Sequence, residues 1–299
     1  MSSLIQPETI SAVRRQFLKA NRTFDSRAAV FETISDRLLQ RLELLAVKPE
    51  RVLDLGCRSG YQLGALAQRY PDAVVVGADP APGQLPQMPR SWPAWLRRSR
   101  PAQSYRIACD PHVLPFADGS FDLVVSNLLL PWCATPHRVF EETARILASG
   151  GVFMFTSAGP DTLMEYRRAW ASIDSHLHSF GLIDMHDLGD TMMASGFAAP
   201  VLDRDNLIVD YPDIAALQEE LRCLGAANIA TGRRQGLMSN TINKRLGADF
   251  PAGQRFPVTL ELVQGHGWKG ELKSKKTETG DINVSVDTLR GSWRRKAGR

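Results

Sequence analysis

Residues 52–60 read VLDLGCRSG, an apolar run that passes directly into a turn with two glycines. The next segment, YQLGALAQRYP at 61–71, has helical spacing and stops at a proline. Where a strand turns at once into a helix, a ligand approaches the backbone closely and a side chain would obstruct it, so Gly56 and Gly60 have a physical reason to be glycine. The stretch predicts a βα unit with a ligand site at its turn.

Similar apolar runs follow along the chain and extend this pattern. We expect four further strands, at 73–79, 104–110, 121–130 and 150–158. A helix at 137–151 connects the last two of them. Strands that alternate with helices favour right-handed βαβ crossovers and a parallel sheet covered on both faces. Several prolines break the segment 80–101, which we expect to be a loop with a short helix near 93–98.

The regions on either side of this core have helical periodicity. Residues 7–47 predict two amphipathic helices. After the core, the pattern predicts helices at 161–174, 184–197 and 213–230 and strands at 199–212 and 256–268. We therefore divide the chain into N-terminal helices at 1–44 that cover the active site, a domain at 45–271 with helical insertions at about 161–183 and 212–255, and a basic, mobile tail at 272–299.

The composition is ordinary for a globular protein. The chain has 299 residues, of which 43% are hydrophobic and 23% charged, so one principal core is expected. No apolar run approaches the ~20 residues that span a bilayer, and the N-terminal residues lack the apolar segment of a signal peptide. We expect a cytoplasmic protein that does not bind membranes.

The net charge of +4 comes mainly from basic residues at 97–100, 233–234 and 269–299. A basic surface suits an acidic partner such as a carrier protein, and a solvated tail explains the same charge equally well. We do not expect a nucleic acid partner. The four cysteines have no CxxC spacing, and the histidines at 176, 178 and 186 lack an HExxH motif or companion carboxylates, so neither a disulfide framework nor a metal site is expected.

Polar side chains end the successive predicted strands. Asp79 ends the second strand, about 20–25 residues after the glycine turn, where a carboxylate can accept hydrogen bonds from both ribose hydroxyls of a nucleoside. Asp54 would face an amino acid part of the ligand. A glycine turn followed by a distant acid also suits a nicotinamide cofactor. Two later features argue against a nicotinamide cofactor. Asp110 is placed to bind an adenine amino group, and the fourth strand brings Asn127 to the same edge.

This succession of strand-end residues resembles the class I S-adenosylmethionine-dependent methyltransferases over about residues 45–160. The resemblance implies a Rossmann-like α/β fold with a seven-stranded, mostly parallel sheet, an antiparallel final strand and a helical lid. It implies S-adenosylmethionine as the cofactor, held by Asp54, Gly56, Arg58, Gly60, Asp79, Asp110 and Asn127. The family usually has glycine where Arg58 stands. Three placements of this side chain are open: it points outward, pairs with the carboxylate of the ligand, or blocks the pocket.

Several further segments together resemble one subfamily, the malonyl-[acyl-carrier protein] O-methyltransferases of biotin synthesis. They lie at 14–25, 36–42, 126–133, 159–163, 184–190, 224–233 and 265–268. The resemblance covers nearly the whole chain up to Gly270. A sister group, the respiratory complex I assembly factors of methyltransferase fold, has a similar arrangement, and the tail after Gly270 resembles theirs at least as well. An assembly or protein-modifying factor is therefore the alternative function.

The subfamily resemblance implies methylation of the free carboxylate of malonyl-[acyl-carrier protein]. A carboxylate is already ionised at neutral pH, so we expect no general base, and positioning of the reactants is the expected mechanism. Arg233 is the candidate that orients the malonyl carboxylate. The other interpretation of Arg233 is a surface arginine in a loop. Trp132 either walls the substrate channel or packs in the core. Phe24 stands where the subfamily generally has tyrosine, so a hydroxyl of the substrate or cofactor site is missing.

Overall fold

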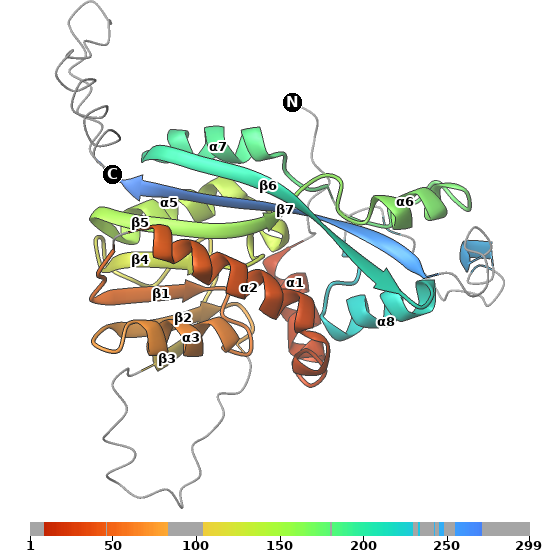
Figure 1. Cartoon of the computed structure of the whole chain (residues 1–299), viewed down its shortest axis with the longest axis horizontal. Coiled ribbons are helices and arrows are strands. Elements are labelled where there is room, and N and C mark those ends of the chain that lie inside the picture. The colour runs from red at the N-terminus through yellow and green to blue at the C-terminus, as the bar shows by residue number, and fades with distance from the viewer. Residues whose placement is uncertain are drawn as a thin grey trace, which may run out of the picture.

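The centre of the molecule is a seven-stranded sheet with the order β3-β2-β1-β4-β5-β7-β6 (Figure 1). Its strands are β1 (Arg51–Leu55), β2 (Val74–Asp79), β3 (Ser104–Ala108), β4 (Phe121–Ser126), β5 (Leu147–Ala158), β6 (Phe197–Tyr211) and β7 (Phe256–Lys269). Strands β1 to β5 pair in parallel, and β7 runs antiparallel to both of its neighbours. The structure, a computed structural model, describes residues 9–45, 47–82, 104–179, 181–229, 233, 242, 245–247 and 255–270.

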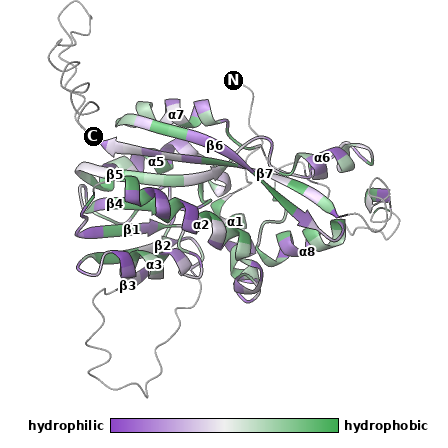
Figure 2. Ribbon diagram, in the orientation of Figure 1, coloured by the Kyte–Doolittle hydropathy of each residue, from purple (hydrophilic) through white to green (hydrophobic). Residues whose placement is uncertain are grey.

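Helices cover both faces of this sheet. They are α1 (Ile10–Ala20), α2 (Ala29–Arg41), α3 (Tyr61–Arg69), α5 (Pro136–Ile146), α6 (Met164–Ala171), α7 (Met185–Ala194) and α8 (Ile214–Cys223). Leu53 of β1 packs in a buried cluster with Phe140 of α5 and Met192 of α7. The next residue towards the N-terminus, Val52, joins a second cluster with Leu38 of α2. Successive side chains of a strand point to opposite faces, so this alternation separates the two apolar layers. In Figure 2 the covering helices mix hydrophobic and hydrophilic residues, as amphipathic helices do.

Strands β6 and β7 extend beyond the end of β5. The β5–β7 pairing stops at the pair Ala158 and Leu262, whereas β6 and β7 stay paired as far as Tyr211 and Phe256. Helices α6 and α8 pack on this extension through a separate apolar cluster that includes Trp170. Figure 1 shows α6 and α8 beyond the main body of the sheet, at the end towards which β1 points. The extension therefore places a helical unit next to the carboxyl edge of the parallel strands.

The predicted strands and helices are found, and the largest differences are at three of their ends. The helix predicted at 137–151 ends at Ile146, because Leu147 already has extended backbone and begins β5. The fourth strand, predicted to reach residue 130, ends at Ser126. The helix predicted at 213–230 ends at Cys223, since Gly225 has a φ of +72° and closes the helix with left-handed backbone.

Some expectations fall outside the described residues. They are the loop and short helix at 80–101, apart from its first three residues, and the tail at 272–299. The division at residues 44 and 271 stays a prediction. Among the described helices, none combines the length and the apolar character needed to cross a membrane.

Candidate active site

The turn after β1 brings the two predicted acids to one edge of the sheet. Strands β1 and β2 are parallel neighbours, so the ends that carry Asp54 and Asp79 lie side by side. The amide of Gly56 donates to the carbonyl of Ala78 at 2.7 Å, which holds the turn against β2. Gly56 has a φ of +92°, and a Cβ there would lie 3.0 Å from the Cβ of Leu129. Glycine is thus required at position 56 both by the left-handed backbone and by the close approach of the Leu129 side chain.

Asp54 is buried, and the Arg106 charge and the hydrogen bonds to its carboxylate compensate this burial only in part. Its Oδ1 accepts a hydrogen bond of 3.1 Å from Gln62 Nε2. Its Oδ2 is buried and has no hydrogen-bond partner among the described residues. Burial, together with the nearby charge of Asp79, raises the pKa of Asp54 to about 8. A buried carboxyl in this setting is suited to a cationic ligand.

Asp79 is also buried, and backbone amides hold both of its oxygens. Oδ1 accepts from the amide of Ala81 at 2.6 Å, and Oδ2 accepts from the amide of Arg58 at 3.0 Å. Burial raises the pKa of this carboxyl, and these amides and the Arg58 charge oppose the increase. Each carboxylate oxygen has a further lone pair, so the group can still accept hydrogen bonds from a diol.

The side chain of Arg58 occupies the space above these acids. Its guanidinium carbon lies 3.9 Å from the ring centre of Phe17 and 4.4 Å from that of Phe24. Nη2 donates to the carbonyl of Leu224 at 3.1 Å, while Nη1 is buried without a hydrogen-bond partner among the described residues. Burial lowers the pKa of the guanidinium to about 10. Of the three placements that the sequence left open, the structure excludes the outward one, because Arg58 lines both small cavities at the acids.

Gly60 and Arg106 pack against each other behind the turn. A Cβ on Gly60 would overlap the guanidinium of Arg106, and this glycine also has a φ of +92°. Arg106 of β3 donates from Nη2 to the carbonyl of Ser59 and from Nη1 to the carbonyl of Arg58, the latter at 3.5 Å. Sequence reasoning missed Arg106, although an arginine inside a short strand of a covered sheet is a signal that could have identified it.

The remaining predicted residues divide into two groups. Asn127 lies at the site, but its amide donates to the carbonyl of Phe31 at 3.0 Å and accepts from Thr156 Oγ1 at 2.6 Å, so it ties β4 to α2 and β5. Asp110 accepts from the amide of His112 at 2.9 Å, and it and Gly60 do not line the small cavities at the acids. Asp110 thus follows the end of β3 next to Asp79 but lines neither of these two cavities.

Two small cavities adjoin the acid pair, and a much larger one lies beside them. The small ones have volumes of about 20 and 40 Å³ and are lined by Phe24, Gly56, Arg58 and Asn127. The large one has a volume of about 310 Å³. It shares four residues with the 20 Å³ cavity: Phe31, Leu128, Trp132 and Leu224. Trp132 is buried and meets Phe17 edge-on at 5.1 Å between ring centres, so it both packs in a core cluster and walls the two cavities.

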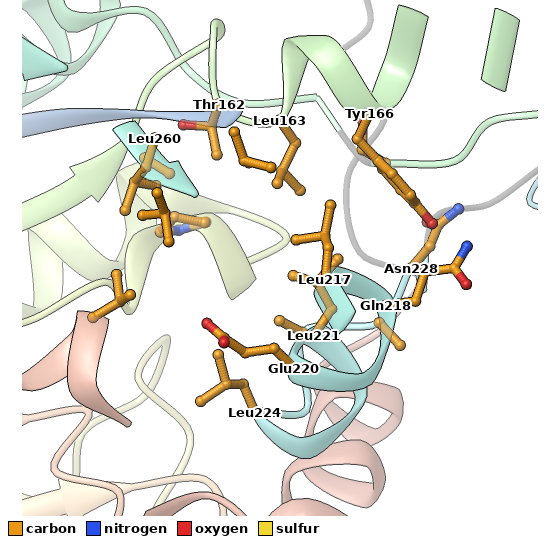
Figure 3. Close-up of a pocket in the computed structure, with 18 of the residues that line it drawn as sticks. Thr162, Leu163, Tyr166, Leu217, Gln218, Glu220, Leu221, Leu224, Asn228 and Leu260 are labelled. Carbon is orange, nitrogen blue, oxygen red and sulfur yellow. The ribbon is translucent and has the colours of Figure 1, made fainter. Parts of the chain in front are cut away.

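The large cavity, called here the acceptor cavity, has mainly apolar walls. Figure 3 shows Leu217 and Leu221 of α8, and Leu224 just after this helix, facing Leu163 and Leu260 across it. One charged group on the wall is Glu220, whose Oε1 accepts from the Tyr211 hydroxyl at 2.8 Å. A chamber of this kind removes water from whatever it holds.

Arg233 does not line the acceptor cavity and is connected to a cavity beside it. Its backbone forms an isolated bridge with Leu177. Leu177 lines a neighbouring cavity of about 450 Å³, which shares His178, Ser179 and Leu182 with the acceptor cavity. His178 stacks on Trp170 and pairs with Asp174 at 2.7 Å. Across the described ranges, no group of three histidine, cysteine or acidic side chains is arranged so that it could hold a metal ion.

Comparisons with known proteins agree with this architecture. The family described as a methyltransferase domain matches residues 53–155, which contain the acid pair and β4. The YcgJ protein from Bacillus subtilis, a solved structure, aligns with 78% of this chain and 98% of its own at a TM-score of 0.53 and 15% identity. The fold is thus the predicted class I methyltransferase fold.

Two curated relatives extend the likeness to the helical unit. The malonyl-[acyl-carrier protein] O-methyltransferase of Laribacter hongkongensis is 38% identical over 89% of this chain and 91% of its own. The protein of the same name from Halorhodospira halophila is 38% identical over 93% of this chain and 94% of its own. Because both relatives align with about nine-tenths of its length, the chain belongs to the malonyl-[acyl-carrier protein] O-methyltransferase family.

Proposed function

We propose that this protein transfers the methyl group of S-adenosylmethionine to the free carboxylate of malonyl-[acyl-carrier protein], forming the methyl ester that starts the pimeloyl chain of biotin. The observation that carries the proposal is the near full-length similarity to relatives of that name. These relatives do not favour the alternative of a respiratory complex I assembly factor. The proposed partner is the carrier protein itself.

The buried acids have the chemistry needed to hold this cofactor. Asp79 would accept hydrogen bonds from the ribose hydroxyls, and the unpartnered Oδ2 of Asp54 would receive the cationic amino group. The backbone at Gly56 permits close approach. These groups fit the cofactor, but the guanidinium of Arg58 lies in the space it needs. Binding therefore requires this side chain to move.

The bound cofactor supplies an electrophilic methyl group on a sulfonium. The protein then has to place a carboxylate in line with that methyl group and exclude water, and it needs no proton acceptor. The leucine-rich walls of the acceptor cavity would remove water from the malonyl group. Arg233 would orient the malonyl carboxylate, because a guanidinium binds a carboxylate through two parallel hydrogen bonds. Phe24 leaves no hydroxyl at its position to share in this work.

Methyl transfer can be measured directly. The full-length protein is incubated with methyl-labelled S-adenosylmethionine and malonyl-[acyl-carrier protein], and the carrier is analysed by mass spectrometry. We expect one base-labile methyl ester on each modified carrier. Acetyl-[acyl-carrier protein], which has no free carboxylate, is the control and should stay unlabelled. Binding of the cofactor without any ester on the malonyl carrier would exclude the proposed reaction.

A further inference from the structure

Arg58 and a nucleoside cofactor cannot occupy the acid pair together. With the guanidinium in place, the two cavities at the acid pair have volumes of about 20 and 40 Å³. One water molecule requires ~10–15 Å³, so these spaces hold only a few water molecules. A nucleoside with an amino acid side arm is far larger, so it can enter only after the Arg58 side chain has left.

We propose that the Arg58 side chain competes with the cofactor for the acid pair. Cofactor binding displaces its guanidinium from between Phe17 and Phe24 and thereby loosens the wall of the acceptor cavity. The inference rests on the proposed cofactor and concerns a position where the resemblance implies glycine. Arg58 then determines how tightly the cofactor binds and in which order the two substrates bind.

Charge is the first argument for competition. Asp54 and Asp79 form a buried acidic pair, and Asp79 is the largest electrostatic attraction acting on the Arg58 charge. A buried acid is stable only with a compensating cation or a bound proton. S-adenosylmethionine has a sulfonium and an ammonium group, so it can replace the guanidinium one cation for another. The Arg58 guanidinium therefore supplies the positive charge that the cofactor would otherwise bring to these acids.

Incomplete hydrogen bonding is the second argument. The guanidinium has five N–H donors. Nη2 has its partner in the carbonyl of Leu224, but Nη1 is buried without one among the described residues. Arg58 also has a φ of +42°, which non-glycine residues rarely adopt. Displacement of the side chain would relieve the buried, unpartnered Nη1, whereas the positive φ belongs to the backbone and would remain.

The position of Leu224 links this displacement to the acceptor cavity. Leu224 follows the last turn of α8, receives the Arg58 hydrogen bond, and lines both the small cavity and the acceptor cavity. Helix α1 is attached to the same turn, since Gln16 Nε2 donates to the carbonyls of Gly225 at 2.9 Å and Ala227 at 2.7 Å. Removing the guanidinium loosens the wall between the two cavities. Cofactor binding should therefore precede acceptor binding.

The first test measures the affinity of S-adenosylhomocysteine by calorimetry on the full-length protein. Two variants separate the side chain from the backbone: Arg58→Ala removes the guanidinium and keeps a Cβ, and Arg58→Gly also relieves the positive φ. We expect both to bind about tenfold or more tightly than the wild type, because an internal competitor reduces apparent affinity. Arg41→Ala, which removes a surface pair with Asp203, is the matched control and should leave the affinity unchanged.

The second test is hydrogen exchange in the same proteins. The amides of Gly225 and Ala226 donate to carbonyls of α8 at 3.1 and 2.7 Å. In Arg58→Ala without ligand, both should exchange about tenfold faster than in the wild type, since the tie to Leu224 is gone.

The outcomes separate this inference from the proposed function. Equal or weaker binding by both Arg58 variants, or unchanged exchange at 225 and 226, would overturn the inference. So would a cofactor complex in which the guanidinium still lies between the two phenylalanine rings, or the absence of any binding heat in all proteins. Tighter binding by the variants without esterification of malonyl-[acyl-carrier protein] would support Arg58 as competitor and reject the acceptor.

Discussion

Gln62 donates a hydrogen bond of 3.1 Å from Nε2 to Oδ1 of Asp54, which ties the first turn of α3 back to β1. The Oε1 of the same amide accepts from Ser35 Oγ of α2 at 3.0 Å. This short chain of hydrogen bonds fixes one oxygen of Asp54, while the other has no hydrogen-bond partner among the described residues. The acid that is proposed to meet the cofactor is thus oriented by two helices.

The first prediction concerns the pH dependence of stability. The pKa of Asp54 is raised from 3.8 to about 8, so above pH ~4 the folded protein keeps a proton that the unfolded chain releases. The free energy of unfolding should therefore fall as the pH rises from about 4 to about 8. Asp54→Asn removes this titration, and its urea unfolding should depend less steeply on pH. Asp79, whose pKa is also raised, should maintain the residual slope. Identical slopes in both proteins would contradict the assignment.

The second prediction concerns a clamp between α5 and the loop before β4. Arg145 donates to both oxygens of Glu142 at 2.9 and 2.8 Å and to the carbonyl of Leu114 at 2.9 Å, and Glu142 in turn accepts from the Leu114 amide. Glu142→Leu leaves the Leu114 amide without its acceptor and removes one partner of the partly exposed Arg145, so it should lower the free energy of unfolding by ~1–3 kcal/mol in urea titrations.

A matched control for the clamp lies on the same helix. Arg138 pairs with Glu141 at 2.7 Å, but both side chains are about half exposed. Solvent screens such pairs, so Glu141→Leu should change the free energy of unfolding by less than ~1 kcal/mol. Equal losses in the two variants would show that the network around Arg145 stabilises the protein no more than an exposed ion pair does.

The third prediction contrasts two glycines with opposite surroundings. A Cβ at Gly265 of β7 would lie 2.6 Å from Cζ of Phe155, so Gly265→Ala should destabilise the protein by ~1–3 kcal/mol. A Cβ at Gly64 in α3 would meet no atom within 4 Å. Gly64→Ala should instead stabilise by ~0.5–1 kcal/mol, because alanine favours a helix interior. Thermal and urea unfolding check both signs, and a change of the same sign in the two variants would count against the packing.

The fourth prediction tests the proposed role of Arg233. Arg233→Leu should lower kcat/KM for malonyl-[acyl-carrier protein] by roughly 10–100-fold, since a hydrogen bond to a charged group contributes ~1.5–3 kcal/mol. Arg233→Lys keeps the charge without the paired donors and should fall between. The affinity for S-adenosylhomocysteine should not change. Arg37→Leu, which removes a surface pair with Asp205 at 2.9 Å, is the control. Full activity of Arg233→Leu would exclude the role.

Much of the fold could be predicted from short segments. Apolar runs marked β1, β2, β4 and β5, because these strands are buried between two helical layers and their side chains have to be apolar. The position of Asp54 and Asp79 followed from the same reading, since parallel strands bring their carboxyl ends to one edge. Helix ends were predicted less well. Gly225 ends α8 where α1 packs against the turn, as a Cβ there would lie 3.0 Å from the Cβ of Ala20, and that contact is 205 residues away in the sequence.

The sequence by itself determined the strand–turn–helix at 52–60, the acidic edge of the sheet and the family, because these depend on local periodicity, on glycine and on similarity along the chain. Only the tertiary structure decided where the Arg58 guanidinium lies and what Asn127 does. Arg58 is held by Phe17, Phe24 and Leu224, which come from three separate segments, and a long flexible side chain takes whichever conformation the surrounding rings and carbonyls stabilise. Such contacts form only when distant segments pack together, so no local pattern can encode them.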